Sequence, residues 1–148
     1  MVGLLDAITG GAAQVWIEYP RHAVKPGEAV HARITVLPRT NFQANGVFLD
    51  LVSEESGYVD VDSRCSDCGN YTYSSERYSR TIYKTSVPLA GPLQLYANYT
   101  LVFQGYVTIP PNAQPTYIGY LKHQWLIRGR VDAFGNDPDS GYQPVIVR

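Results

Sequence analysis

Two cysteines separated by two residues form the sharpest chemical motif of this sequence. Cys65 and Cys68 are the two cysteines of the chain. Thiolates at this spacing can bind one tetrahedral Zn²⁺, but a closed zinc site needs four ligands, so histidines or a second chain would have to complete it. A redox dithiol or a disulfide is another interpretation, although thioredoxin-like pairs lie at a helix N-terminus. A polar loop favours inert thiols, so we expect no cofactor, with zinc at Cys65 and Cys68 as the alternative.

No pattern of catalytic residues accompanies the cysteines. The three histidines, His22, His31 and His123, are scattered along the chain, and no Gly-x-Ser-x-Gly motif presents a nucleophilic serine. Gly10-Gly11 is not followed by the Lys-Ser/Thr pair of a phosphate-binding loop. His123 shares its parity with apolar neighbours and is interpreted as a core histidine. The sequence therefore predicts a protein that is not an enzyme.

Tyrosines and acidic residues flank the cysteine pair. Tyr71, Tyr73 and Tyr78 follow it, in a chain with 12 tyrosines. Aromatic side chains are enriched in protein interfaces, so these three are candidate interaction residues. Packing over a sheet edge would explain them equally well. The acidic residues of segment 50–67 lack the ligand spacing and central glycine of a calcium-binding loop, and we interpret them as solvated.

Charge and composition argue against two classes of partner. The formal net charge is −1 at pH 7, which gives no general attraction to nucleic acid. No stretch approaches the roughly 20 apolar residues that span a bilayer, so we expect no membrane insertion. The first residues lack the basic start and long apolar run of a secretory signal. We therefore expect a cytoplasmic protein, with residues 1–13 as a loose N-terminal segment.

The elements that would position these residues are β-strands. Apolar residues alternate with polar ones in segments 15–19, 30–36 and 47–51, and again in 93–109 and 121–131. Turn residues separate the segments, for example Lys25-Pro26-Gly27-Glu28. Because helical spacing is nearly absent, the pattern predicts a single all-β domain over residues 1–148, a two-sheet antiparallel sandwich of about seven to nine strands.

Two finer expectations concern the core and the longest connection. Segment 54–80 is the least patterned and is long for a loop, and three interpretations stay open: a functional segment, a disordered segment, or one that hides a strand around Arg77 to Val87. The predicted core comprises Ile17, Ile34, Leu49, Leu101, Phe103, Trp125 and Ile127.

The order of several motifs is similar to that of a known superfamily. The turn and strand Val24 to Val30, the strand Val47-Phe48-Leu49-Asp50-Leu51 with its polar insertion, and Val107-Thr108-Ile109-Pro110 occur in this order. Over residues 14–148 the chain resembles the arrestin-like superfamily, which includes arrestin-domain proteins, the arrestin-fold retromer subunit and bacterial sporulation-control proteins. The resemblance implies an immunoglobulin-like β-sandwich that binds other proteins. Relatives usually have two lobes and this chain has one, and no basic pair precedes the first strand, so phosphate sensing is not carried over.

The function that we expect is therefore that of a non-enzymatic adaptor or scaffold domain that resembles one arrestin lobe. Its partner is a protein of unknown identity, or a second copy in a homodimer with segment 69–83 at the interface, because a lone lobe leaves sheet edges open. Two alternatives stay open: a secreted or surface immunoglobulin-like binding module, and a zinc-binding protein that uses the loop of Cys65 and Cys68.

Overall fold

The structure is a computed structural model that describes residues 11–64 and 71–148, and within segment 59–75 only the backbone. In this part of the chain every regular element is a strand. The strands are β1 (Ala13–Glu18), β2 (Ala29–Pro38), β3 (Phe42–Arg64), β4 (Tyr71–Ala90), β5 (Leu93–Leu95), β6 (Leu101–Thr108), β7 (Tyr117–Ile118), β8 (Lys122–Ala133) and β9 (Gln143–Val145).

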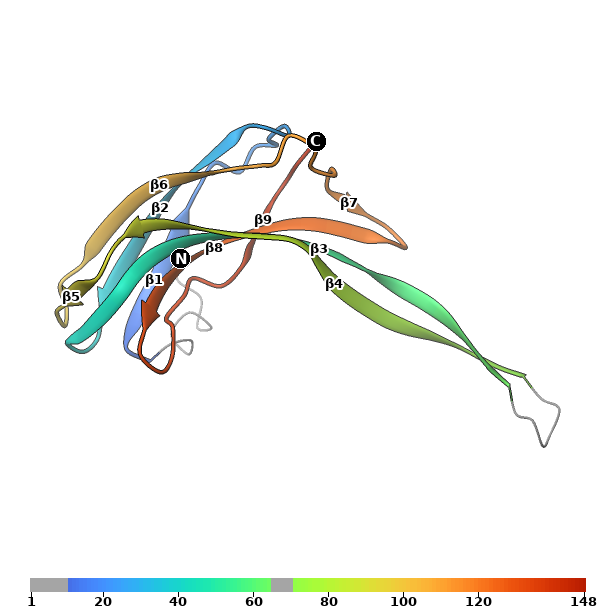
Figure 1. Cartoon of the computed structure of the whole chain (residues 1–148), viewed down its shortest axis with the longest axis horizontal. Coiled ribbons are helices and arrows are strands. Elements are labelled where there is room, and N and C mark those ends of the chain that lie inside the picture. Colours follow the sequence, from blue (N-terminus) through green and yellow to red (C-terminus); the bar gives the residue numbers. More distant parts are fainter. Residues whose placement is uncertain (1–10, 65–70) are drawn as a thin grey trace.

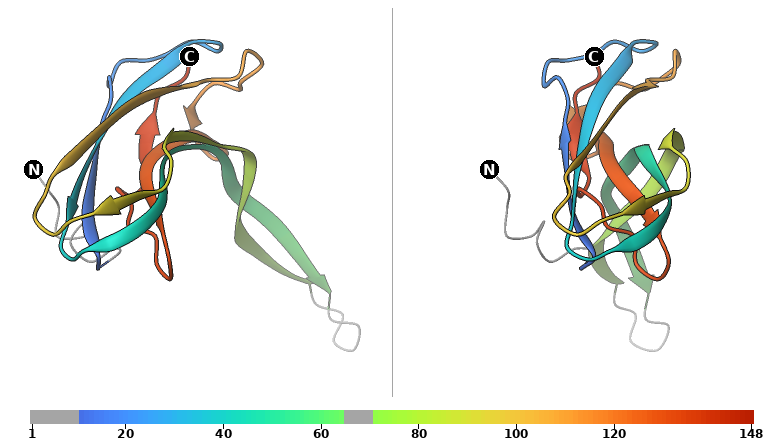
Figure 2. Two further views of the ribbon diagram at one scale, coloured as in Figure 1. Left: turned by 60° about the vertical axis from the view of Figure 1, so that its left-hand side comes forward. Right: turned by 90° about the vertical axis from the view of Figure 1, so that its left-hand side faces the viewer.

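The strands form two antiparallel sheets packed face to face (Figures 1 and 2). The smaller sheet has the order β1-β2-β6, and the larger has the order β4-β3-β8-β7, with β5 paired to β3 and β9 paired to β8. The predicted turn before β2 is present: Gly27 adopts φ 88° and its N–H donates to the carbonyl of Ile109 over 2.9 Å. The predicted all-β antiparallel sandwich is confirmed.

Alternating apolar residues give each sheet one buried face. Ile34 and Val36 of β2 face Leu49 of β3 and Ile127 of β8, and all four are 0% exposed. Gly129 of β8 makes room for this packing, because a Cβ there would lie 2.8 Å from Cδ1 of Ile34. The smaller sheet thus packs directly against the backbone of the larger one.

The predicted core is confirmed except on β6. Ile17, Trp125 and the other predicted residues outside β6 are buried, and His123 is 1% exposed, as expected for a core histidine. Leu101 and Phe103 are only half-buried, so their predicted burial was wrong. They lie on β6, the edge strand of the smaller sheet, where a neighbouring strand covers one side alone.

The described part of the least patterned segment, 54–80, belongs to a β-hairpin. β3 and β4 pair from Val47 with Ala90 as far as Arg64 with Tyr71, whereas β8 accompanies β3 only as far as Ser56. Beyond Ser56 the two strands leave the sandwich as a two-stranded ribbon (Figures 1 and 2). A register shift between Ser53 and Glu54 lies shortly before the ribbon departs, as is typical of a bulge that bends a strand. The alternative of a hidden strand around Arg77 to Val87 is therefore the correct one, although the strand begins earlier, at Tyr71, and pairs with the extension of β3.

Candidate interaction surface

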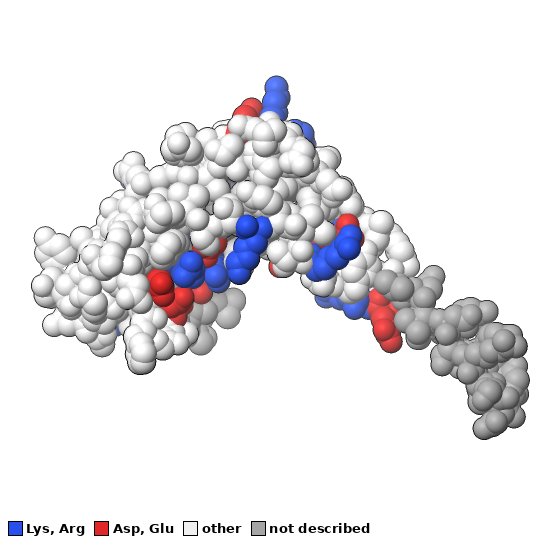
Figure 3. Space-filling model, in the orientation of Figure 1, with Lys and Arg blue, Asp and Glu red and all other residues white. Residues whose placement is uncertain are grey.

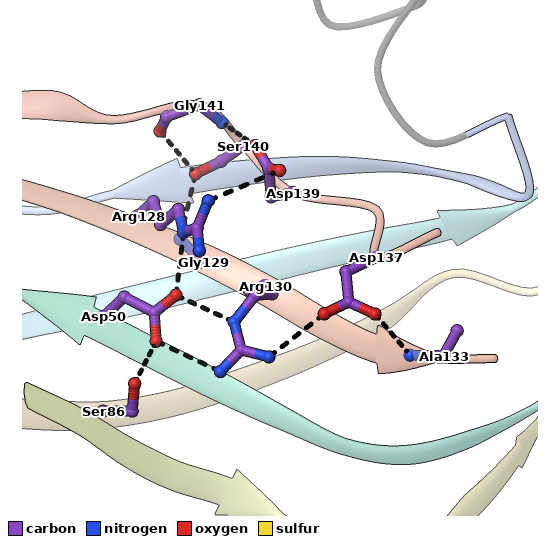
Figure 4. A network of polar contacts seen from close by, with 10 residues as sticks. All are labelled: Asp50, Ser86, Arg128, Gly129, Arg130, Ala133, Asp137, Asp139, Ser140 and Gly141. Atoms are coloured by element: carbon purple, nitrogen blue, oxygen red, sulfur yellow. Dashed lines mark hydrogen bonds and ion pairs between the residues drawn. The ribbon is translucent and has the colours of Figure 1, made fainter. Parts of the chain in front are cut away.

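A buried carboxylate lies at the centre of a polar network on the outer face of the larger sheet (Figure 4). Asp50 of β3 is 1% exposed. Ser86 Oγ donates to its Oδ1 over 2.6 Å, and the Nε atoms of Arg128 and Arg130 donate to its Oδ2 over 2.8 and 2.9 Å. The strand register brings these groups together, because Asp50 pairs with Ser86 of β4 on one side and with Arg128 of β8 on the other.

Two further carboxylates engage the same guanidinium groups. Asp137 Oδ2 lies 3.3 Å from Nη1 of Arg130, and Asp139 Oδ2 lies 3.7 Å from Nη1 of Arg128. Burial alone would raise the pKa of Asp50, but the hydrogen bonds from Arg130, Ser86 and Arg128 outweigh it and hold the pKa below its ordinary value. Asp50 is therefore ionised at neutral pH, and both arginines have their charge compensated.

The network fastens the loop that follows β8 onto the sheet. Ser140 Oγ accepts from the N–H of Gly129 over 2.9 Å, and the N–H of Val131 donates to the carbonyl of Pro138 over 2.8 Å. Figure 3 shows basic and acidic side chains together on the concave side of the arch formed by the sandwich and the hairpin. Because carboxylates already engage these arginines, we assign the network a structural role: it clamps β3, β4 and β8, the strands that support the ribbon.

Exposed aromatic and aliphatic side chains surround the base of the hairpin. Tyr58 of β3 and Tyr120, just before β8, are 50% and 66% exposed, and their ring centroids lie 6.2 Å apart. Leu121 and Ile118 are also exposed, at 46% and 79%. We call this set the hairpin-base patch and define it as Tyr58, Tyr78, Tyr117, Ile118, Tyr120 and Leu121. By strand register Tyr58 and Ile118 lie on one face of the sheet, and Tyr78, Tyr117 and Leu121 lie on the opposite face, so the set flanks the hairpin base on both faces. Exposed large apolar side chains of this kind are typical of interaction sites.

Close packing at Gly57 joins the inner part of the hairpin-base patch. A Cβ at Gly57 would lie 2.8 Å from Cδ2 of Leu121 and 3.1 Å from Cε1 of Tyr78, so a larger residue there would require the exposed end of Leu121 to move. Tyr78 is half-buried, and its hydroxyl donates to Oε1 of Glu55 over 3.4 Å. Partial burial and the Glu55 carboxylate raise the pKa of Tyr78, so its hydroxyl stays a hydrogen-bond donor over the physiological range.

The structure describes the site residues predicted from the sequence to different extents. Cys65 and Cys68 lie outside the described residues. Tyr71 and Tyr73 lie on β4, where their backbones pair with Arg64 and Asp62, and their side chains are outside the described part. Tyr78 belongs to the hairpin-base patch. Sequence reasoning missed Tyr58, Tyr117, Ile118, Tyr120 and Leu121, because their grouping depends on the pairing of β3 with β4 and β8.

Among the residues that the structure describes, neither a cluster of metal ligands nor a membrane-spanning helix is present. Within residues 11–58 and 76–148, whose side chains the structure describes, no three His, Cys, Asp or Glu side chains lie together as metal ligands would. In the same residues there is no helix with the length and apolar character needed to cross a bilayer.

Comparison with known proteins identifies the architecture. No family model matches the sequence, and no curated protein matches it. Among solved structures, the chain is similar to the crystal structure of Spo0M, a sporulation control protein from Bacillus subtilis, with a TM-score of 0.64 and 19% sequence identity. The match covers 93% of this chain and 50% of that one, so the chain spans about half the length of that protein. At this identity the similarity concerns the fold, and the expected arrestin-like sandwich is confirmed.

Proposed function

We propose that this chain is a non-enzymatic protein-interaction domain, an adaptor or scaffold built on one arrestin-like lobe, and that it binds through the hairpin-base patch. The observation that carries the proposal is the exposure of tyrosine, leucine and isoleucine side chains around a ribbon that leaves the sandwich. Tyrosine is enriched in protein interfaces because its ring supplies apolar contact area and its hydroxyl stays hydrogen-bonded. The arrestin-like architecture supports a regulatory or adaptor role by analogy of fold.

The ribbon itself supports the same proposal. A two-stranded hairpin has marginal stability in water, and its open edges can accept a further strand. Within the described residues, β4 is the edge strand of the larger sheet, and beyond Ser56 the other edge of the ribbon is open as well. A protein partner that packs on the patch or pairs with an edge would cover these groups.

Affinity capture with matched variants tests this role. The tagged chain, the patch variant Tyr58→Asp/Tyr120→Asp and the control Phe134→Asp would be used to capture proteins from the source cell, followed by mass spectrometry. Phe134 is 101% exposed and follows β8, at the opposite end of that strand from Tyr120. We expect a protein that is captured by the wild type and the control and lost with the patch variant, and that rebinds when purified. Capture that is equal for all three chains would contradict the proposal.

A second copy of the chain is the partner that the sheet geometry favours. Antiparallel pairing of β4 with β4 of another copy would continue the larger sheet across a twofold axis, the commonest symmetry of homodimers. With Tyr78 at the axis, Glu76 of one copy would pair with Arg80 of the other, since antiparallel partners have a constant sum of residue numbers. The predicted homodimer through segment 69–83 is therefore kept as a proposal.

Light scattering coupled to size exclusion measures this association. We expect a mass near twice 16.4 kDa at tens of micromolar for the wild type. Tyr78→Asp/Ile82→Asp places charge on β4 and should return the chain to 16.4 kDa, whereas the control Val102→Asp, at a 52% exposed position of β6, should not. A monomeric wild type would contradict the dimer and leave the capture experiment to identify another partner.

A further inference from the structure

The two sides of the sandwich are covered to different extents. On one side β9 pairs with β8, and the segment after β9 reaches the connection between β1 and β2, where Val24 donates to the carbonyl of Ile146 over 2.8 Å. On the other side lie β4 and β6, the outermost described strands of the larger and the smaller sheet. Apolar residues of these two strands pack against the core but are only half-buried: Tyr83, Val87, Leu89, Leu101 and Phe103. The core is therefore most accessible along β4 and β6.

A groove of about 530 Å³ follows this accessible side. Its walls come from segment 83–89 of β4 and segment 104–108 of β6. The two strands meet at its floor, because a Cβ at Gly105 would lie 2.2 Å from Cδ2 of Leu89. Of the lining residues only Val107 is buried, so a partner can reach the others.

The backbone of β6 presents hydrogen-bonding groups to this groove. The N–H of Ile109, the residue after β6, donates to the carbonyl of Glu28 just before β2 over 2.9 Å. Alternate residues of an antiparallel strand direct their N–H and C=O groups to opposite sides, so residues 101, 103, 105 and 107 point toward β2 as Ile109 does. Gln104, Tyr106 and Thr108 then direct theirs away from β2. These groups are open to water in the free chain and can pair with one further strand.

The edge of β4 is less suited to such pairing. Val47 pairs with Ala90 and Phe48 with Pro88, so Leu89 is an extra residue that interrupts the register of β4. Pro88 also has no N–H to donate. Both features weaken the hydrogen-bonding pattern of β4 beside the groove, and β6 is therefore the edge to which a strand would add.

The side chains of β4 indicate the composition of that strand. Thr85 and Val87 pair with Leu51 and Leu49, which are 0% exposed, so they face the inner side of the sheet and form the bed of the groove together with Leu89. None of the lining residues is charged, and a charged side chain placed there would lose hydration without a compensating charge. Successive side chains of an added strand point alternately to this bed and to solvent. The strand therefore needs an uncharged apolar residue at every second position.

We propose that this groove binds an extended peptide segment of a partner protein, which adds to the free edge of β6 and places uncharged apolar side chains over Val87 and Leu89. Main-chain hydrogen bonds supply affinity in this mode of recognition, and alternate side chains supply specificity. Segment 104–108 extends over about 17 Å at about 3.4 Å per residue, which suits a peptide of about five to seven residues. The groove is separate from the hairpin-base patch, so the inference adds a second contact to the proposed function and does not rest on it.

NMR of the full chain with the peptide acetyl-Lys-Val-Thr-Val-Thr-Val-Lys-amide tests the proposal, since the three valines of this peptide share one face. We expect saturable shifts and slower hydrogen exchange for the amides of Gln104, Tyr106 and Thr108. The amides of residues 103, 105 and 107 already face β2, so their exchange should change little.

Two control peptides separate the contributions of side chains and backbone. One has aspartate in place of all three valines, and the other carries a methyl group on every backbone amide nitrogen. Each should bind at least about tenfold more weakly, because the first brings charge into an uncharged groove and the second cannot donate hydrogen bonds to β6.

Variants of the chain provide matched controls, with melting temperatures to verify that each is folded. Thr85→Asp places a charge in the groove without altering β6 and should weaken peptide binding at least about tenfold. Thr100→Asp makes the same change at an exposed position outside the lining and should leave binding unchanged. Gln104→Pro removes one N–H from the free edge, where strands tolerate proline, and should also weaken binding.

The proposal is overturned if the valine peptide produces no saturable shift at its solubility limit, if the methylated peptide binds equally well, or if Thr85→Asp binds like the wild type. Slow exchange of the Gln104 and Tyr106 amides that grows with chain concentration, without peptide, would assign the groove to a second copy and also overturn it. These outcomes leave the hairpin-base patch untouched, because the capture experiment tests that surface separately.

Discussion

At the scale of single residues, Asp50 is the group on which the polar network depends. It accepts hydrogen bonds from Ser86, Arg128 and Arg130, which come from the two strands on either side of β3. Nothing in the sequence of segment 47–51 distinguishes Asp50 from an ordinary outward-facing acid. The sequence around Arg128 and Arg130 is equally compatible with solvent-exposed arginines on the outer face of the sheet. Their partnership follows from the register of three strands that are far apart in the sequence.

Replacing the carboxylate tests the energy of this network. Asp50→Asn leaves two guanidinium groups facing a neutral amide. We expect the free energy of unfolding to fall by about 2–4 kcal/mol, somewhat less than for a fully buried pair because Arg128 and Arg130 are 23% and 18% exposed. Chemical denaturation measures it. The exposed pair of Glu18 with Arg33 is the control, and Glu18→Gln should cost under about 1 kcal/mol. Equally small losses of unfolding free energy in Asp50→Asn and Glu18→Gln would mean that the network does not stabilise the packing of β3, β4 and β8.

The same carboxylate predicts a pH dependence. The pKa of Asp50 is lowered below its ordinary value of 3.8, so the folded state holds the ionised form more strongly than the unfolded state does. Its stabilisation is complete above the ordinary pKa and is lost as pH falls through the lower, folded pKa. The difference in unfolding free energy between wild type and Asp50→Asn should be constant from pH 7 to about 5 and shrink below about pH 4. A difference that persists undiminished at pH 2 would contradict the assignment.

The cysteine pair gives a separate residue-scale prediction. Cys65 and Cys68 offer two ligands where a closed zinc site needs four. We therefore expect chain purified without added metal to contain zinc well below one equivalent by elemental analysis, and the value to be unchanged in Cys65→Ser. One equivalent of zinc that is lost in Cys65→Ser would overturn this expectation and support the zinc alternative.

At the scale of elements, the contact between the sheets depends on a residue without a side chain. A Cβ at Gly129 would lie within 2.9 Å of three side-chain carbons of Ile34, which is 0% exposed and has no free space to enter. We expect Gly129→Ala to lower the unfolding free energy by about 1–3 kcal/mol through overpacking. Gly91→Ala, where no atom lies within 4 Å, should change it by less than about 0.5 kcal/mol in the same denaturation assay. Similar changes in unfolding free energy for the two variants would show that the contact between the sheets at Gly129 accommodates a methyl group.

The elements also show what the sequence could predict. Val30, Ala32, Ile34 and Val36 reveal β2 because one face of that strand is buried and the other is not. The outer half of the hairpin is harder to recognise, since β8 accompanies β3 only as far as Ser56 and the strands continue as a two-stranded ribbon. Only short alternating runs remain there, Val59 to Asp62 and Tyr71 to Tyr73, and the polar residues between them hide the continuous strands. The hairpin-base patch is hidden too, because its members become neighbours only once β3 pairs with β4 and β8.

At the scale of the whole molecule, one arrestin-like lobe carries a ribbon that extends well beyond its core (Figure 1). The lobe corresponds to about half the length of the similar sporulation control protein. Its described sheet edges and the hairpin-base patch are exposed, and under the proposed function a protein partner would cover them. The polar network at Asp50 joins β3 to β4 and β8 within the sandwich, before the ribbon begins beyond Ser56.

Photocrosslinking from the hairpin-base patch tests the central claim most directly. p-Benzoylphenylalanine would replace Tyr120 in one chain and Phe134 in another, two exposed positions at opposite ends of β8, about 40 Å apart for a strand of 12 residues. After irradiation in the source cell, the account predicts a discrete adduct from position 120, with a second copy or another protein, and none from position 134. No adduct from position 120, or the same adducts from both positions, would contradict the claim that this domain binds proteins through the base of its hairpin.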